Sequence, residues 1–112
     1  MFCRQPLSAA IIGSGIAGIS TAYEFSKRGK SVIVIDRGGI CGGMTSRTSA
    51  HLAPLCDDLV SEMIKIKGKK ATKLFCESQA AAVDRIEEIQ KKEKINCDFR
   101  RLDGYLFQGW DM

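Results

Sequence analysis

The stretch Ser8-Ala-Ala-Ile-Ile-Gly13-Ser-Gly15-Ile-Ala-Gly18 decides the fold of this chain. Its apolar beginning, residues 8–12, is typical of a strand buried on both faces of a parallel sheet. Residues 16–28 then follow the period of an amphipathic helix. A second β-branched run, residues 31–35, ends on a single acid, Asp36. Strand, helix and strand in such close succession predict a right-handed βαβ crossover unit in an α/β fold.

The glycine spacing G-x-G-x-x-G predicts a turn that binds a dinucleotide. Gly13 permits the tight turn, Gly15 lets a pyrophosphate approach the backbone, and Gly18 lets the helix pack against the strand. The start of the helix then directs its N–H groups and the positive end of its dipole at the phosphates. We therefore assign cofactor binding to the whole turn, including its intervening residues Ser14, Ile16 and Ala17. A turn that serves packing alone is the alternative.

Asp36 narrows the choice of nucleotide. It follows Gly18 by about one crossover, where a carboxylate can accept both ribose hydroxyls of an adenosine. A carboxylate also repels a 2′-phosphate, so NADP is disfavoured, and NAD and FAD remain. The alternative is that Asp36 is a solvent-exposed acid at the end of a strand and has no ligand.

Residues 37–54 carry glycines and hydroxyls without a helical or strand period, so we expect a long loop with a function. Simple NAD folds rarely need such a loop, which favours FAD. Its residues supply close backbone approach, hydroxyl donors and cations near the phosphates. The candidate cofactor-binding residues in this loop are Arg37, Gly42, Gly43, Ser46, Arg47 and Thr48.

The remainder of the chain predicts helices and then a change of architecture. Asp57 can cap a helix that carries Leu59, and Gly68 stops that helix. A longer helix is expected over residues 69–93. The alternation from Ile95 to Phe99 and the turn signal Asp103-Gly104 predict a β-hairpin. We therefore expect a Rossmann-like FAD-binding segment with its following helices in residues 1–94, and the start of an antiparallel substrate domain in residues 95–112.

Composition sets further limits. The lysines of residues 65–73 and 91–94, in a chain of net charge +4, indicate solvated helix faces rather than nucleic-acid contacts. Five scattered cysteines favour a reducing, cytoplasmic location and, with one histidine, support no metal site. Cys41 is interpreted as a packing residue rather than a site of flavin attachment, and His51 receives no catalytic role. No stretch is long enough to span a bilayer.

Two segments give the chain a family resemblance. The sequence "IIGSGIAGISTAYEFSKRGKSVIVID" (11–36), followed by "GGMTSRTSAHLAP" (42–54), resembles the N-terminus of FAD-dependent oxidoreductases of the D-amino acid oxidase and glycine oxidase superfamily. The sequence "ESQAAAVDRIEEIQKKEKINCDFRRLDGYLF" (77–107) resembles the branch whose members often carry a C-terminal Rieske iron-sulfur domain. The family commonly has Glu where Asp36 stands, so the shorter arm could place the ribose differently.

The resemblance implies a function. Gly13, Gly15 and Gly18 would hold the pyrophosphate, Asp36 the ribose, and residues 43–48 the phosphates, with Arg37 beside the adenine. It implies oxidation of a small amine or amino acid by hydride transfer to the flavin, and a 2Fe-2S cluster whose ligands lie outside these residues. At 112 residues the chain is shorter than such an enzyme requires, so we expect a fragment without turnover of its own. An NAD-dependent dehydrogenase, a truncated non-catalytic nucleotide-binding module and a structural module are the alternatives.

Overall fold

The computed structural model describes residues 6–54 and 60–105. The chain divides into two compact units, Met1–His51 and Leu52–Met112, which are described separately. None of the helices in the described ranges is both long and apolar enough to cross a bilayer.

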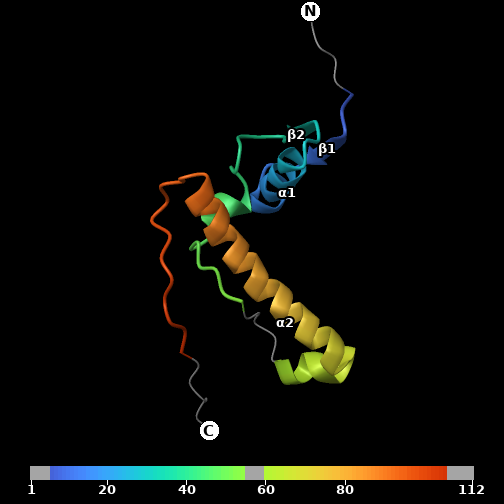
Figure 1. Cartoon of the computed structure of the whole chain (residues 1–112), viewed down its shortest axis with the longest axis vertical. Helices are drawn as coiled ribbons and strands as arrows, with labels where there is room; N and C mark the ends of the chain where they lie inside the picture. Colours follow the sequence, from blue (N-terminus) through green and yellow to red (C-terminus); the bar gives the residue numbers. More distant parts are fainter. Residues whose placement is uncertain (1–5, 55–59, 106–112) are drawn as a thin grey trace, which may run out of the picture. The chain divides into compact units, whose positions relative to one another are not determined.

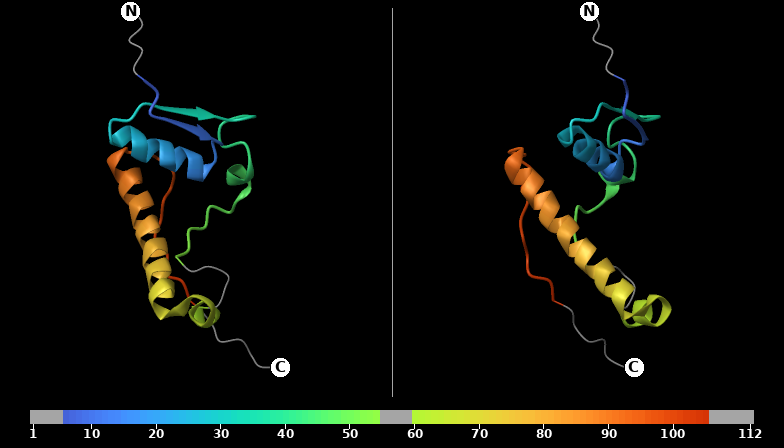
Figure 2. Two further views of the ribbon diagram at one scale, coloured as in Figure 1. Left: turned by 90° about the vertical axis from the view of Figure 1, so that its right-hand side faces the viewer. Right: turned by 45° about the vertical axis from the view of Figure 1, so that its right-hand side comes forward.

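The first unit is a βαβ crossover, as predicted. Strand β1 (Ala9–Ile12) leads into helix α1 (Ile16–Lys27), and strand β2 (Val32–Ile35) follows. The strands pair in parallel, with Ala9 opposite Val32 and Ile12 opposite Ile35. Figure 2 shows the two arrows pointing the same way, with α1 along one face of the sheet. The carboxyl ends of both strands therefore meet at the same edge as the start of α1.

Only one face of this two-stranded sheet is covered within the described residues. Ile11 faces α1, since its Cγ2 lies 3.4 Å from where a β-carbon on Gly18 would stand. On the opposite face Ile12, Ile33 and Ile35 are exposed. The expectation of a strand buried on both faces is thus not met in this unit, because one crossover helix supplies only one covering layer.

A glycine follows the C-terminal end of helix α1, after Lys27 and the cap residue Arg28. Gly29 has φ +70°, and the Lys30 N–H donates to the carbonyl of Phe25 at 3.1 Å. Such bonds satisfy the last carbonyls of a helix and turn the chain out of it, which a left-handed residue makes possible. The turn sends the chain directly into β2.

The loop after β2 contains one element that the sequence did not reveal. Residues Met44–Arg47 form a single 3-10 turn, η1. Its hydroxyls bond locally: Ser46 Oγ donates to the Gly43 carbonyl at 2.8 Å, and Thr48 Oγ1 donates to the Thr45 carbonyl at 3.4 Å. A single turn is too short to show a periodic spacing of apolar residues, so a hydroxyl-rich sequence of this kind predicts a loop.

The second unit is dominated by helix α2 (Val60–Lys92), which is broken at Gly68. Gly68 has φ 79° and ψ 160°, a conformation that essentially only glycine adopts. Figure 1 shows the resulting bend between a short and a long helical segment. The predicted stop at Gly68 is confirmed, whereas the proposed cap Asp57 and the apolar Leu59 lie outside the described residues.

Residues 93–105 contain no strand, so the strand predicted from Ile95 to Phe99 is wrong. Instead, this segment returns along α2 (Figure 1), where Arg101 donates to Glu87 at 2.6 Å and to Asp84 at 2.5 Å. A lone strand has no ladder partner for its backbone groups, and the second half of the expected hairpin, from residue 106 on, lies outside the described residues. The change of domain at residue 95 stays a prediction.

Candidate nucleotide-binding site

Two glycines of the motif are required by the protein's own structure, Gly13 by its backbone conformation and Gly18 by packing. Gly13 has φ +103°, and its N–H donates to the Ile35 carbonyl at 2.7 Å. A β-carbon on Gly18 would stand 1.9 Å from the Gly13 carbonyl oxygen, far inside any permitted contact. The helix therefore begins directly against the end of β1.

Gly15 differs from these two. A β-carbon there would meet only the Thr45 hydroxyl oxygen, at 3.0 Å, so no backbone atom enforces this glycine. It borders the first turn of α1, where helix geometry leaves the N–H groups of Ile16, Ala17 and Gly18 without intrahelical acceptors. That first turn carries no acidic residue. Because Gly15 has no side chain, the electropositive N-terminal end of α1 stays accessible.

Thr45 lies within the 43–48 segment that the resemblance assigns to the phosphates, but the sequence did not single it out as a site residue. Its Oγ1 accepts the N–H of Ile16 at 3.0 Å, bridging 29 positions of sequence. Thr45 stands among several hydroxyl residues of the loop, and nothing in the sequence distinguishes it from Ser46 or Thr48. The hydroxyls of those two predicted site residues bond locally around η1 instead: Ser46 donates to the Gly43 carbonyl, and Thr48 donates to the Thr45 carbonyl and accepts the Ala50 N–H.

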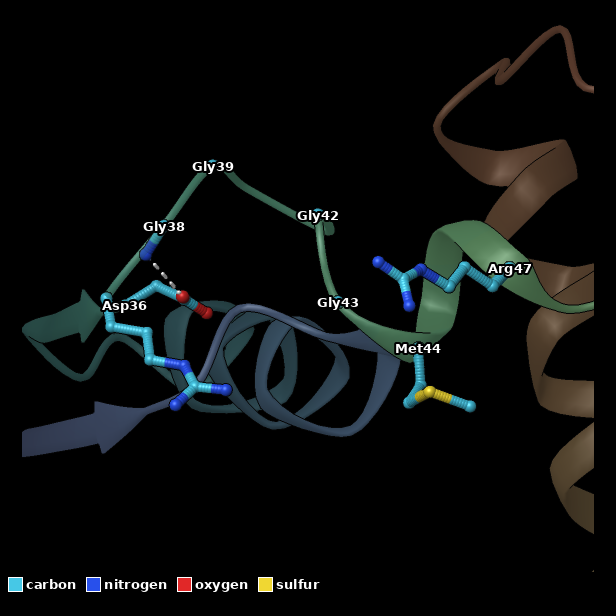
Figure 3. Close-up of a pocket in the computed structure, with 8 residues that line it drawn as sticks. Asp36, Gly38, Gly39, Gly42, Gly43, Met44 and Arg47 are labelled. Carbon is cyan, nitrogen blue, oxygen red and sulfur yellow. Dashed lines mark hydrogen bonds between the residues drawn. The ribbon is translucent and has the colours of Figure 1, made fainter.

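The carboxylate of Asp36 faces the glycine turn. Its Oδ2 accepts the N–H of Ser14 at 2.6 Å and the Ser14 hydroxyl at 2.7 Å. Its Oδ1 accepts the N–H of Gly38 at 2.9 Å (Figure 3). The Ser14 hydroxyl, followed by the backbone N–H groups of Ser14 and Gly38, lowers the pKa of Asp36 to about 2. The end of β2 thus presents an ionised carboxylate beside the turn.

Ser14 also connects the turn to the loop that follows β2. The Ser14 carbonyl accepts both the N–H and the thiol of Cys41, each at 3.2 Å. The Cys41 N–H lies 3.3 Å from Ser14 Oγ as well. Ser14 is 2% exposed, whereas Cys41 is half-buried. Cys41 therefore helps to hold this loop on the turn.

Two open cavities adjoin Asp36 and Arg37. The first, of about 240 Å³, is also lined by Ile12 and Gly13. The second, of about 350 Å³, is lined by residues of the loop and η1, namely Asp36, Arg37, Gly38, Gly39, Gly42, Gly43, Met44 and Arg47. Figure 3 shows the Arg47 side chain reaching back towards the glycines of the loop. Glycine backbone, two cations and one carboxylate suit a ligand that carries both phosphate and sugar hydroxyls.

The structure brings most predicted site residues together. Gly13, Asp36, Arg37, Gly42, Gly43 and Arg47 line the cavities, and residues 14–18 form the turn and the start of α1. Gly38, Gly39 and Met44 are additional lining residues that the sequence did not single out. Within residues 6–54 and 60–105, no group of three or more His, Cys, Asp or Glu side chains is placed to hold a metal ion.

Comparison with known proteins identifies the chain's relatives. Residues 8–111 match the family described as FAD dependent oxidoreductase (DAO). YhfW of Bacillus subtilis, named as a Rieske 2Fe-2S iron-sulfur protein, is 36% identical over 97 residues, which are 87% of this chain and 19% of YhfW. OrdL of Haemophilus influenzae, named as an oxidoreductase, is 33% identical over 92 residues, 81% of this chain and 21% of OrdL.

A third relative matches only the first half of the chain. The bifunctional protein MnmC of Psychrobacter cryohalolentis, named for tRNA 5-methylaminomethyl-2-thiouridine biosynthesis, is 41% identical over 51 residues, 46% of this chain and 7% of MnmC. No solved structure matches the chain. The chain spans about a fifth of the length of YhfW and OrdL. Because the family match extends over nearly all of its residues, the chain belongs to the family of FAD dependent oxidoreductases (DAO).

Proposed function

We propose that this chain provides the binding site for the ADP half of FAD in an oxidoreductase that acts on a small amine or amino acid. One observation carries the proposal: the Asp36 carboxylate is held against a glycine turn at the start of α1, beside cavities lined by Arg37 and Arg47. This arrangement offers an acceptor for a sugar hydroxyl and donors for a diphosphate within one small region.

The residues fit the cofactor in chemical type. The backbone at Gly15 and the first N–H groups of α1 would hold the pyrophosphate, because the space beside Gly15 is bordered only by the Thr45 hydroxyl, which a phosphate oxygen would replace as the acceptor of the Ile16 N–H. Asp36 would hold the ribose, Arg47 would add charge beside the phosphates, and Arg37 would lie near the adenine. When bound, the flavin supplies the group that accepts hydride from the substrate. The chain's own residues bind and orient that cofactor.

Two further proposals concern the rest of the protein. Substrate-contacting residues would belong to a part of the enzyme beyond these 112 residues, so the chain alone would have no turnover. The length of YhfW and OrdL supports this, since the matched region is a small share of each. The name of YhfW supports a Rieske 2Fe-2S cluster in the same protein. Rieske clusters need two His ligands, and this chain has one His, so the cluster would also require additional sequence. A cytoplasmic location stays a prediction.

The test is the cofactor content of the intact protein that contains this chain. We expect a yellow protein whose flavin absorbance survives gel filtration and whose released cofactor is FAD. Gly15→Val should abolish retention, since the added methyls would fill the space towards Thr45 and the helix end. Gly104→Val is the matched control, because a β-carbon at Gly104 meets nothing within 4 Å. A colourless protein that binds NADH would reject the proposal.

The substrate class needs a separate measurement. Anaerobic mixing of the yellow protein with a panel of amines and amino acids should bleach the flavin absorbance with at least one of them. Bleaching by none of the panel, in a protein that retains FAD, would reject the substrate class and leave the cofactor assignment standing.

A further inference from the structure

The bend of α2 at Gly68 carries a cluster of basic residues. Residues 60–74 contain five lysines and a single acid, Glu62. One of the lysines, Lys73, lies 3.7 Å from Glu77 in an ion pair. The other four are exposed and have no ion pair among the described residues, namely Lys65, Lys67, Lys69 and Lys70. The bend therefore has a concentrated positive charge that the described part of the chain does not neutralise.

Apolar side chains are exposed among these lysines. Ile66 is 76% exposed and Leu74 is 59% exposed. The break at Gly68 divides the stretch, so Ile66 belongs to the short helical segment and Leu74 to the long one (Figure 1). Lys65 and Lys67 flank Ile66 in the chain. Both segments of the bend thus expose aliphatic and cationic side chains to solvent.

The residue types of the bend indicate which partner it suits. Residues 60–74 contain neither arginine nor an aromatic residue. Directional recognition of phosphates favours the arginine fork, whereas base stacking and protein hot spots rely largely on aromatic side chains and arginine. An anionic lipid surface requires none of these residues. Its potential attracts lysines, and its interface accepts aliphatic side chains.

We infer that this basic bend, defined by Lys65, Ile66, Lys67, Lys69, Lys70 and Leu74, is a docking surface for an anionic lipid bilayer. The lysines approach the headgroups, while Ile66 and Leu74 enter the boundary between headgroups and acyl chains. Four charges and two aliphatic side chains give a peripheral and reversible attachment. Because the surface lies in the second unit, its binding to lipid does not depend on the cofactor proposed for the first.

The experiment measures sedimentation of the intact protein that contains this chain with two kinds of vesicle, phosphatidylcholine alone and phosphatidylcholine with phosphatidylserine in equal parts. The protein should bind only the vesicles that contain phosphatidylserine. Salt at about 1 M should release most of it, because the Debye length is then about 3 Å. Each lysine near an anionic surface strengthens binding about fivefold, so loss of all four should weaken it about a hundredfold or more. The variant combines Lys65→Gln, Lys67→Gln, Lys69→Gln and Lys70→Gln.

A matched control removes the same charge from exposed positions outside the basic bend. It should weaken binding by less than about fivefold, because charges more than a Debye length from the lipid are screened. This control combines Lys30→Gln, Lys92→Gln, Lys94→Gln and Arg100→Gln. Far-UV circular dichroism of both variants checks that α2 is retained. Equal weakening by the two variants would overturn the inference, as would a failure of the unmodified protein to bind phosphatidylserine vesicles.

The aliphatic side chains need a separate variant. Ile66→Ser combined with Leu74→Ser keeps every charge and should weaken binding about tenfold, because less apolar surface then leaves water. Unchanged binding would overturn the inference, since the bend would then be a general site for polyanions. In that case a mixed-sequence RNA oligonucleotide should bind through the same four lysines.

Discussion

Replacement of Gly18 by alanine tests the packing of the glycine turn. In a helix interior, alanine is favoured over glycine by about 1 kcal/mol, so local propensity alone predicts stabilisation. The structure predicts that the substitution destabilises the protein instead. The new β-carbon would lie 1.9 Å from the Gly13 carbonyl oxygen and 3.0 Å from the Gly13 carbonyl carbon.

The size of the destabilisation depends on how far the Gly13 carbonyl must move to make room for the new β-carbon. The Gly13 carbonyl would have to shift by about 1 Å to reach even the shortest tolerated contact, and packed interiors resist such shifts. The shift would also disturb the bond from the Gly13 N–H to the Ile35 carbonyl, which ties the turn to β2. Overpacking of this kind costs about 1–3 kcal/mol, occasionally more. After the helical gain is subtracted, we expect a net destabilisation of about 1 kcal/mol, and of about 2 kcal/mol at the upper end of that range.

The assay is urea unfolding of the intact protein without cofactor, followed by far-UV circular dichroism. Gly39→Ala serves as the control, because a β-carbon there meets nothing within 4 Å and Gly39 is not in the left-handed region. That control should stay within about 0.5 kcal/mol of the unmodified protein. If Gly18→Ala is as stable as the Gly39→Ala control, the close approach of helix and strand is not the reason for this glycine.

Other perturbations address the site and the second unit. Asp36→Asn should lower the free energy of unfolding at pH 7, and the deficit should vanish as the pH falls from about 4 towards 2. The reason is that the folded-state pKa of Asp36 lies at about 2, below the ordinary 3.8, so its stabilising contribution is complete above this range of pH and is lost as the pH falls through it; a deficit as large at pH 2 as at pH 7 would contradict the assignment. Thr45→Val should destabilise the cofactor-free protein by about 1 kcal/mol, because the Ile16 N–H loses its acceptor. With FAD bound, the same substitution should lower the free energy of unfolding by less in the same assay, because a phosphate oxygen would accept the Ile16 N–H in place of the hydroxyl. An equal loss with and without FAD would show that no phosphate replaces the hydroxyl. Arg101→Gln should speed hydrogen exchange in residues 95–105, because it removes the ion pairs that join this segment to α2. Arg100→Gln is the control, since Arg100 has no ion pair among the described residues, and it should leave the exchange rates unchanged. Equal rates in the two variants would show that the ion pairs do not hold the segment.

The sequence by itself determined the two strands and the α-helix of the first unit. An apolar strand, a glycine turn and an amphipathic helix each leave a local pattern, because side-chain period and left-handed backbone are properties of neighbouring residues. Gly13 and Gly68 illustrate this, since each adopts a positive φ that glycine tolerates without strain. The position of Asp36 at the end of β2 follows from the same local reasoning.

Tertiary structure decided the contacts that join distant residues. Neither the bond from Ile16 to Thr45 nor the bonds from Ser14 to Asp36 have a local signature. The first depends on how the loop after β2 returns to the turn, and the second on the pairing of β1 with β2. The segment from residue 95 shows the converse. Its alternation suited a strand, but in the described residues it lies along α2 and bonds through Arg101. A strand exists only when a partner satisfies its backbone, and a local pattern cannot supply that partner.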